Sequence, residues 1–212
     1  PKKKELNILD TKSIKNYLKK IKPKSVLHLA GLSRPMIEHE KNISKSINLN
    51  IIGTGNIVRI CSELKIKLIY FSTSYVYPGT VGNYKETDAL LPWNNYAWSK
   101  LGGECAVMMY SNSLILRVSM TERPFVHKFA YNNFKTNFIF HDQVAEFLPK
   151  LFKYKGVINV GGKSRTVYNF SKKYNPKIKG KKLTKKSGLF KINTSMNIDK
   201  LKKIINDKIL VL

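Results

Sequence analysis

The stretch from Leu68 to Ser74, Leu-Ile-Tyr-Phe-Ser-Thr-Ser, joins four apolar residues to three consecutive hydroxyl side chains. A short continuous apolar run predicts a strand buried on both faces, as in a parallel sheet. Ser72, Thr73 and Ser74 then fall at the carboxyl end of the strand, where open parallel sheets bind ligands. The stretch therefore predicts an α/β fold with functional side chains at this strand end.

Outward from this strand, short apolar runs alternate with helical patterns along most of the chain. We predict further strands at residues 6–9, 25–30, 114–118 and 156–160, and helices at about residues 11–21, 43–64, 96–110 and 141–152. Asp10 is placed to cap the first helix. The long amphipathic stretch has Ile47, Ile51, Ile57, Val58 and Leu64 near helical spacing, and Gly53 and Gly55 within it predict close packing. This alternation predicts a parallel sheet with crossover helices.

Composition narrows the class of protein. The 212 residues carry a net charge of +26, with 34 Lys and 5 Arg spread over most of the chain. Dispersed lysines without many arginines disfavour nucleic acid as a partner and favour a general attraction for anionic substrates. No apolar run approaches the roughly 20 residues of a membrane span, and no signal peptide is visible. Cys61 and Cys105 lack metal-ligand spacing, which predicts two buried, reduced thiols in a cytoplasmic protein without a metal site.

Tyr96 and Lys100 are the residues best suited to proton transfer. They lie four apart near the start of a predicted helix, so their side chains share one face. A phenol has an ordinary pKa near 10, and an ammonium one turn away stabilises the phenolate and lowers that pKa. A hydroxyl from another strand end, such as that of Thr73, could bind the same substrate oxygen. Taken alone, the spacing is common and is also typical of an aromatic core residue beside a solvated lysine.

The surrounding motifs resemble those of the extended short-chain dehydrogenase/reductases. The resemblance covers roughly residues 5–205, and its motifs are His28-Leu29-Ala30-Gly31, Asn50-Ile51-Ile52-Gly53-Thr54 with Asn56, Phe71–Tyr77, Glu86, Pro92, Asn95–Lys100, Gly103-Glu104, Leu116–Ser119 and Val157–Gly162. It implies a Rossmann-like doubly wound parallel sheet with a small carboxyl-terminal substrate lobe. We expect a partial dinucleotide-binding domain at residues 1–120 and a substrate lobe at 121–212, some of whose elements return to the main sheet.

The resemblance also implies roles for individual residues and a cofactor, NAD or NADP. Thr73, Tyr96 and Lys100 match the catalytic triad. The implied cofactor-binding residues are Asn7, Ile8, Leu29, Ala30, Gly31, Ser72, Tyr96, Lys100 and Ser119, and the implied substrate-binding residues are Ser74, Tyr75 and Arg123. Asn7 stands where the family often has an aspartate that contacts adenine, and an amide oxygen can accept the same hydrogen bond. We expect His28 to be a hydrogen-bonded core residue rather than a base.

One family feature is missing from the sequence. The first strand, the glycine-rich turn that binds pyrophosphate and the first helix would precede Pro1. We therefore expect a chain of these 212 residues to bind dinucleotide poorly and to lack the first strand of the sheet.

The segment around Thr73 indicates the subfamily. Nucleotide-sugar 4,6-dehydratases typically have Thr-Asp-Glu here, whereas this chain has Thr73-Ser74-Tyr75 with no carboxylate. The segment Ser72–Tyr77 is similar to the Ser-Thr-Asp-Tyr-Val-Phe-like segment of the dTDP-4-dehydrorhamnose reductases of rhamnose biosynthesis. The implied reaction is NAD(P)H-dependent reduction of the C4 ketone of a nucleotide-diphosphate-linked 4-keto-6-deoxy sugar, and a homodimer is the assembly to expect. Two alternatives stay open, a nucleotide-sugar epimerase with tightly bound NAD and a non-catalytic protein that uses this fold to bind anions or partners.

Overall fold

The computed structural model describes residues 1, 5–125, 127–184 and 192–205, and they form two compact units. Unit 1 comprises Pro1–Ser72, Asn94–Leu116 and Tyr154–Val157, and unit 2 comprises Thr73–Trp93, Arg117–Lys153 and Ile158–Leu212. The units therefore interleave along the sequence. The functional division predicted at residue 120 stays a prediction.

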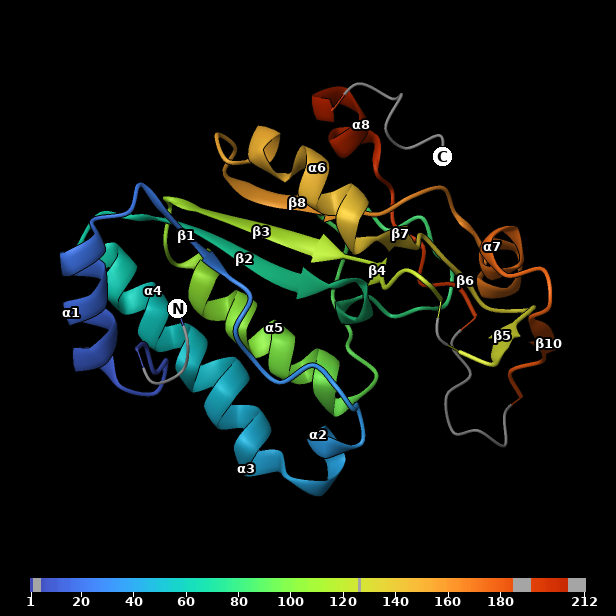
Figure 1. Ribbon diagram of the computed structural model, residues 1–212, viewed down its shortest axis with the longest axis horizontal. Helices are drawn as coiled ribbons and strands as arrows, with labels where there is room; N and C mark the ends of the chain where they lie inside the picture. The colour runs from blue at the N-terminus through green and yellow to red at the C-terminus, as the bar shows by residue number, and fades with distance from the viewer. Residues whose placement is uncertain (2–4, 126, 185–191, 206–212) are drawn as a thin grey trace. The chain divides into compact units, whose positions relative to one another are not determined.

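The largest sheet of the described residues has four strands. Its strands are β1 (Ser25–His28), β2 (Lys67–Thr73), β3 (Ser113–Val118) and β8 (Gly156–Val160), in the order β1-β2-β3-β8 (Figure 1). The first two strands run parallel, with Ser25 opposite Lys67 and His28 opposite Tyr70. All residues of β3 and all but the first of β2 are buried, as a continuous apolar run predicts. The parallel α/β fold is thus confirmed.

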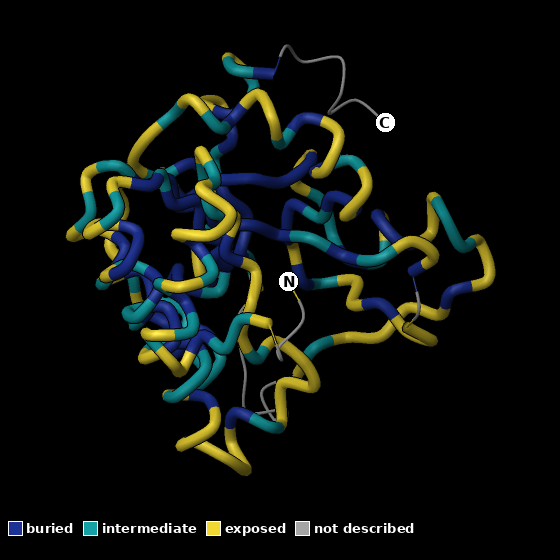
Figure 2. The backbone as a smooth tube through the Cα atoms, turned by 60° about the vertical axis from the view of Figure 1, so that its left-hand side comes forward, coloured by how far each residue is buried: buried dark blue, intermediate teal, exposed yellow. Residues whose placement is uncertain are grey.

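Unit 1 also contains helices, which pack on its strands. They are α1 (Thr11–Ile21), the short α2 (Glu38–Lys41) and α3 (Ile43–Ser46), the π-helix η1 (Ile47–Ile52), α4 (Gly53–Glu63) and α5 (Asn95–Met108). Asp10 caps α1 as predicted, because its carboxylate accepts hydrogen bonds from the N–H groups of Lys12 and Ser13. A buried cluster that includes Ile14, Leu18 and Ile57 packs α1 and α4 on the strands. Figure 2 shows the buried residues as dark segments separated by exposed turns.

Two predicted strands differ from the structure. Residues 6–9 form a turn rather than a strand, because the Asn7 side chain accepts a hydrogen bond from Leu9 N–H and the Asn7 carbonyl accepts one from Asp10 N–H. The strand predicted at 25–30 ends at His28, and its Leu27 is 36% exposed. Among the described residues, β1 is the end strand of the sheet.

The other errors concern faces of helices. Ile47, one of the apolar residues at helical spacing, is 42% exposed and is the first residue of the π-helix η1. Cys61 is buried as predicted, but Cys105 is exposed on α5. Gly53 packs tightly, since a Cβ there would lie 2.7 Å from the Ile8 side chain, whereas Gly55 has no atom within 4 Å.

The described residues of unit 2 form several short strand pairs, three α-helices and one 3-10 helix. Its strands are β4 (Met120–Thr121), β5 (Phe129–Tyr131), β6 (Lys135–Thr136), β7 (Ile139–Phe140), β9 (Arg165–Thr166) and β10 (Lys179–Lys181), and its helices are η2 (Ser74–Val76), α6 (His141–Leu151), α7 (Val167–Tyr174) and α8 (Asp199–Ile205). The pairs are β4 with β7, β5 with β10 and β6 with β9. An aromatic cluster around Phe125, Phe140 and Phe170 forms its core. Within the described residues, no helix of either unit has the length and apolar content of a membrane span.

Candidate active site

Tyr96 lies in the first turn of α5, which begins at Asn95. The helix starts there because the Asn94 side chain accepts a hydrogen bond of 2.8 Å from Ala97 N–H. Lys100 follows one turn later, so both side chains leave the same side of the helix. The two residues that the sequence assigned to proton transfer thus lie one turn apart on the same helix of unit 1.

Asn50, in η1, connects the helix to the loop after β1. Its Nδ2 donates hydrogen bonds of 2.8 Å to Ser99 Oγ and to the Leu32 carbonyl, and its Oδ1 accepts one from Leu32 N–H. Ser99 Oγ in turn donates to the Tyr96 carbonyl. Asn50 is 1% exposed, so these bonds are shielded from water. It therefore fixes the start of α5 against the loop that follows Gly31.

Close backbone approach makes this connection possible. At Gly103, on α5, a Cβ atom would lie 2.5 Å from the Tyr70 hydroxyl oxygen and 2.8 Å from the Asn50 carbonyl oxygen. Only glycine leaves room for α5 to pack this closely on η1 and β2. The sequence placed Asn50 and Gly103 in family motifs, but it gave neither residue this positioning role.

The environment of Lys100 lowers the pKa of its amine. Burial is the main cause and brings this pKa from 10.5 to about 7, against the opposing effect of the Glu104 carboxylate. The Lys100 Nζ lies 4.1 Å from the centre of the Tyr70 ring, whose hydroxyl donates a hydrogen bond to the Lys100 carbonyl. Only the protonated amine stabilises a neighbouring phenolate, so the lowered pKa reduces the fraction of Lys100 that can do this above neutral pH.

His28 is the core residue that the sequence predicted. It is 3% exposed, and its Nε2 lies 3.0 Å from Thr54 Oγ1. Burial first, and then the charge of Lys100, lower its pKa from 6.5 to about 3. The ring is therefore neutral at physiological pH, and it adds no second positive charge beside Lys100.

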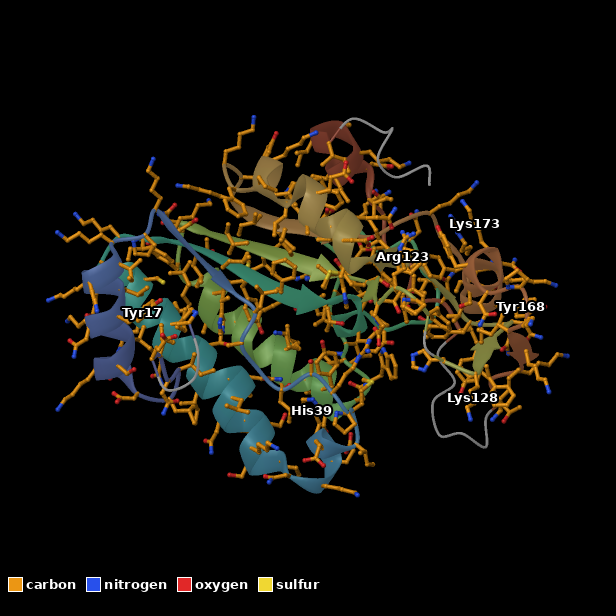
Figure 3. The ribbon with its side chains drawn as sticks, viewed as in Figure 1. Tyr17, His39, Arg123, Lys128, Tyr168 and Lys173 are labelled. Atoms are coloured by element: carbon orange, nitrogen blue, oxygen red, sulfur yellow. The ribbon has the colours of Figure 1, made fainter. Side chains whose placement is uncertain are left out.

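His39, labelled in Figure 3, is a neighbour of Tyr96 that sequence reasoning missed. Its ring meets the Tyr96 ring edge to face at a centroid distance of 5.2 Å, and its Nδ1 lies 2.7 Å from Ser46 Oγ. Burial lowers the pKa of His39. The side chain of Asn95 ties the same segment to α5 by donating to Glu40 Oε2. Separation by more than fifty residues hid this contact, since no local spacing links His39 to Tyr96.

A cavity of about 590 Å³ in unit 1 gathers most of the predicted cofactor residues. Asn7, Ile8, Leu29, Ala30 and Gly31 all line it, together with apolar side chains of α1 and β1. A mainly apolar cavity with one amide at its wall is typical of a site for a flat heteroaromatic group. The residues present therefore fit the adenine end of a dinucleotide.

The strand end at residues 72–75 spans the boundary of the two units. Ser72, in unit 1, is 2% exposed, and its hydroxyl has no hydrogen-bond partner among the described residues. In unit 2, Thr73 Oγ1 accepts a hydrogen bond from Tyr75 N–H, and both Thr73 and Ser74 are buried. The Tyr75 ring packs on Trp93 at 4.8 Å.

The remaining predicted residues, Ser119 and Arg123, lie in unit 2. Ser119 Oγ is 2.9 Å from Thr136 Oγ1, an internal contact. The Arg123 guanidinium lies 4.1 Å from the centre of the Phe140 ring and 3.4 Å from the Asp142 carboxylate, and Figure 3 labels it near β4 and β7. Among the described residues, no group of three His, Cys, Asp or Glu side chains is placed to hold a metal ion.

Comparison with known proteins relates this site to a family. The family model of the RmlD substrate binding domain matches residues 1–144. Methionine adenosyltransferase 2 subunit beta of Xenopus laevis is 33% identical over 114 residues, which are 53% of this chain and 34% of that protein. The probable low-salt glycan biosynthesis reductase Agl14 of Haloferax volcanii is 32% identical over 117 residues, 54% of this chain and 39% of that protein. The matched part thus spans less than half the length of these curated relatives.

Solved structures agree on the fold. The dTDP-4-dehydrorhamnose reductase of Bacillus anthracis, crystallised with NADP, superposes with a TM-score of 0.85 at 20% identity, covering 96% of this chain and 82% of that one. At that identity the likeness establishes the Rossmann-like architecture, while the family match covers more than half of the sequence. The chain belongs to the RmlD substrate binding domain family, as the short-chain dehydrogenase/reductase motifs around Tyr96 and Lys100 predicted.

Proposed function

We propose that the protein is a nucleotide-sugar reductase that uses NADH or NADPH to reduce the C4 ketone of a 4-keto-6-deoxy sugar. The observation that carries the proposal is the pair on α5, Tyr96 with Lys100 one turn away on the same face of the helix. The relation to the RmlD family and the reductases among its relatives support the same reaction class.

In this proposal Tyr96 is the acid. Its hydroxyl donates a proton to the oxygen that becomes the C4 hydroxyl, and protonated Lys100 stabilises the phenolate left behind. The family resemblance assigns a second hydrogen bond to that oxygen to Thr73. Asn50 and His39 hold the helix and the phenol ring in place through the contacts already described.

The nicotinamide cofactor supplies the hydride when it is bound. Asn7, Ile8, Leu29, Ala30 and Gly31 would hold its adenine end in the unit 1 cavity, with Ser72 and Ser119 as further contacts. Ser74, Tyr75 and Arg123 would contact the sugar nucleotide, and a guanidinium is suited to its diphosphate.

Turnover of the reduced cofactor tests the proposal. The protein is mixed with NADPH or NADH and dTDP-4-keto-6-deoxy sugar, and loss of the reduced nicotinamide is followed by its absorbance. We expect Tyr96→Phe and Lys100→Met to lower kcat/KM by about a hundredfold or more, because each removes a group needed for proton transfer. Tyr131→Phe, a substitution on the surface of unit 2, should leave it unchanged. Full turnover by Tyr96→Phe would show that Tyr96 is not the acid, and conversion of the sugar without net cofactor consumption would indicate an epimerase.

A second candidate function is a partner-binding subunit without catalysis. The observation that favours it is that several relatives, at 31–33% identity, are named as subunit beta of methionine adenosyltransferase 2. Co-elution of the protein with a methionine adenosyltransferase in size-exclusion chromatography, together with absence of reductase turnover, would favour this candidate. Turnover without co-elution would favour the reductase.

A further inference from the structure

Unit 2 contains a cavity of about 740 Å³ whose lining residues the proposed reaction does not use. It is formed by four segments that are distant in sequence, namely the turn at Asn83, residue 137, the loop 163–165 and residues 196–202. Its volume falls in the range of sites for small organic ligands and far exceeds that of a single water.

Asn137 holds three of these segments together. Its Nδ2 donates a hydrogen bond of 2.9 Å to the Gly162 carbonyl, its own carbonyl accepts one of 2.9 Å from Gly162 N–H, and its Oδ1 accepts one from Met196 N–H. The side chain is 2% exposed, and a Cβ at Gly161 would lie 2.6 Å from Asn137 Cβ. The walls of the cavity are therefore fixed by buried hydrogen bonds and tight packing.

Cations line this cavity from two directions. Lys163 and Arg165 come from the loop after β8, and Lys202 comes from α8. Arg165 starts strand β9, which pairs with β6, and its guanidinium lies 5.9 Å from the centre of the Phe170 ring. Backbone pairing and the ring contact restrict this arginine more than an isolated surface lysine.

The carboxylate among the lining residues is already engaged. Asp199 accepts a hydrogen bond of 3.0 Å from Asn197 Nδ2 and lies 3.8 Å from Lys202 Nζ. With three cations and one carboxylate, the lining has a net charge of two positive charges. Asn83 and Ser164 add neutral polar groups, and Met196 and Ile198 add apolar surface.

We infer that this cavity binds an organic diphosphate, with Lys163 and Arg165 on the phosphate oxygens. The net charge matches a doubly charged anion, and a guanidinium is suited to bidentate contact with phosphate. The apolar and amide surface offers contacts to the organic part of the ligand. The inference concerns binding alone, so it stands whether or not the protein is a reductase.

Calorimetric titration with inorganic pyrophosphate at constant ionic strength tests the anion-binding part directly. We expect Arg165→Gln and Lys163→Gln each to weaken binding about tenfold or more, since each removes a charge-assisted contact. Lys203→Gln is the matched control, because Lys203 is exposed on the same helix as Lys202 and does not line the cavity. Equal weakening by Lys203→Gln would mean diffuse attraction to a basic protein and would overturn the inference, as would no binding by the parent protein.

Ser164→Glu provides a second test that removes no stabilising contact. Ser164 is exposed, so the glutamate should be tolerated by the fold while it repels a diphosphate from the cavity. We expect pyrophosphate binding to fall at least tenfold, with an unchanged circular dichroism melt. Parental affinity in this variant would place the anion elsewhere and refute the inference. Uridine diphosphate is then titrated as the organic probe, and affinity no better than that of pyrophosphate would show that the organic part makes no contact.

Discussion

Replacement of Lys100 by methionine should stabilise the protein, and by an amount that depends on pH. Burial lowers the pKa of Lys100 from 10.5 to about 7, so the unfolded chain binds more protons than the folded protein between these values. The free energy of unfolding of the parent protein therefore rises with pH between pH 7 and 10.5. Below pH 7 the parent carries the full free-energy cost of burying the charged amine. The two pKa values differ by about 3.5, and each pKa unit corresponds to about 1.36 kcal/mol, so the cost is at most about 4.8 kcal/mol.

The change with pH is the measurable quantity. The same two pKa values imply that the cost of Lys100 falls by about 2.3 kcal/mol between pH 7 and pH 9. Methionine keeps a similar length and packs in the same space without a charge. Urea unfolding of the parent and of Lys100→Met is followed by circular dichroism at pH 6, 7, 8 and 9. The difference in free energy of unfolding between the variant and the parent should decrease by that amount from pH 7 to pH 9.

Two control variants separate this effect from others. Lys203→Met, at an exposed position of α8, should change the free energy of unfolding by less than about 0.5 kcal/mol, with no trend over the same pH range. The second control uses Glu104→Gln, which removes the carboxylate that raises the pKa of Lys100. The difference in free energy of unfolding between the double variant Lys100→Met/Glu104→Gln and Glu104→Gln alone should show the same trend with pH. A constant difference between Lys100→Met and the parent from pH 6 to 9 would refute the argument that burial shifts this lysine.

Three other results follow from the packing. Gly103→Ala should lower the free energy of unfolding by about 3 kcal/mol, because its Cβ would lie 2.5 Å from a buried phenol oxygen. Gly55→Ala, with no atom within 4 Å, should raise it by about 0.5–1 kcal/mol. Equal effects of the two substitutions in calorimetry would contradict the close approach of α5. Cys105 should react with a thiol reagent in the folded protein, while Cys61, whose pKa burial raises to about 12, should react only on unfolding; rapid labelling of both would contradict the burial of Cys61. Asn50→Ala should cost about 2–3 kcal/mol in urea unfolding because it leaves buried partners unpaired, and a loss below 0.5 kcal/mol would show that its bonds do not connect the loop to the helix.

Features governed by near neighbours were predictable from the sequence. Asp10 caps α1 because a carboxylate reaches the N–H groups two and three residues on, and this contact needs no tertiary partner. The spacing of Tyr96 and Lys100 places them on one helical face for the same reason. The continuous apolar run around Leu68 predicted a buried parallel strand correctly. The family motifs extended these local statements to the fold.

Contacts between distant segments were not predictable in this way. Residues 6–9 have the apolar composition of a strand, but the side chain of Asn7 closes a turn instead. The exposure of Cys105 depends on which face of α5 packs on its neighbours, and both thiols looked alike in sequence. His39 meets Tyr96 only because the fold returns the segment after β1 to the start of α5.

Residue types and local spacing therefore determined the class of fold, the caps and the pairing of the phenol with the amine. Tertiary packing decided the chemistry of that pair, because the pKa of Lys100 falls to about 7 only when distant segments exclude water from its amine. The same holds for the cavity of unit 2, since Lys163 and Lys202 are almost forty residues apart and are brought together by the buried amide of Asn137. Burial depends on the whole chain, and a linear pattern does not specify it.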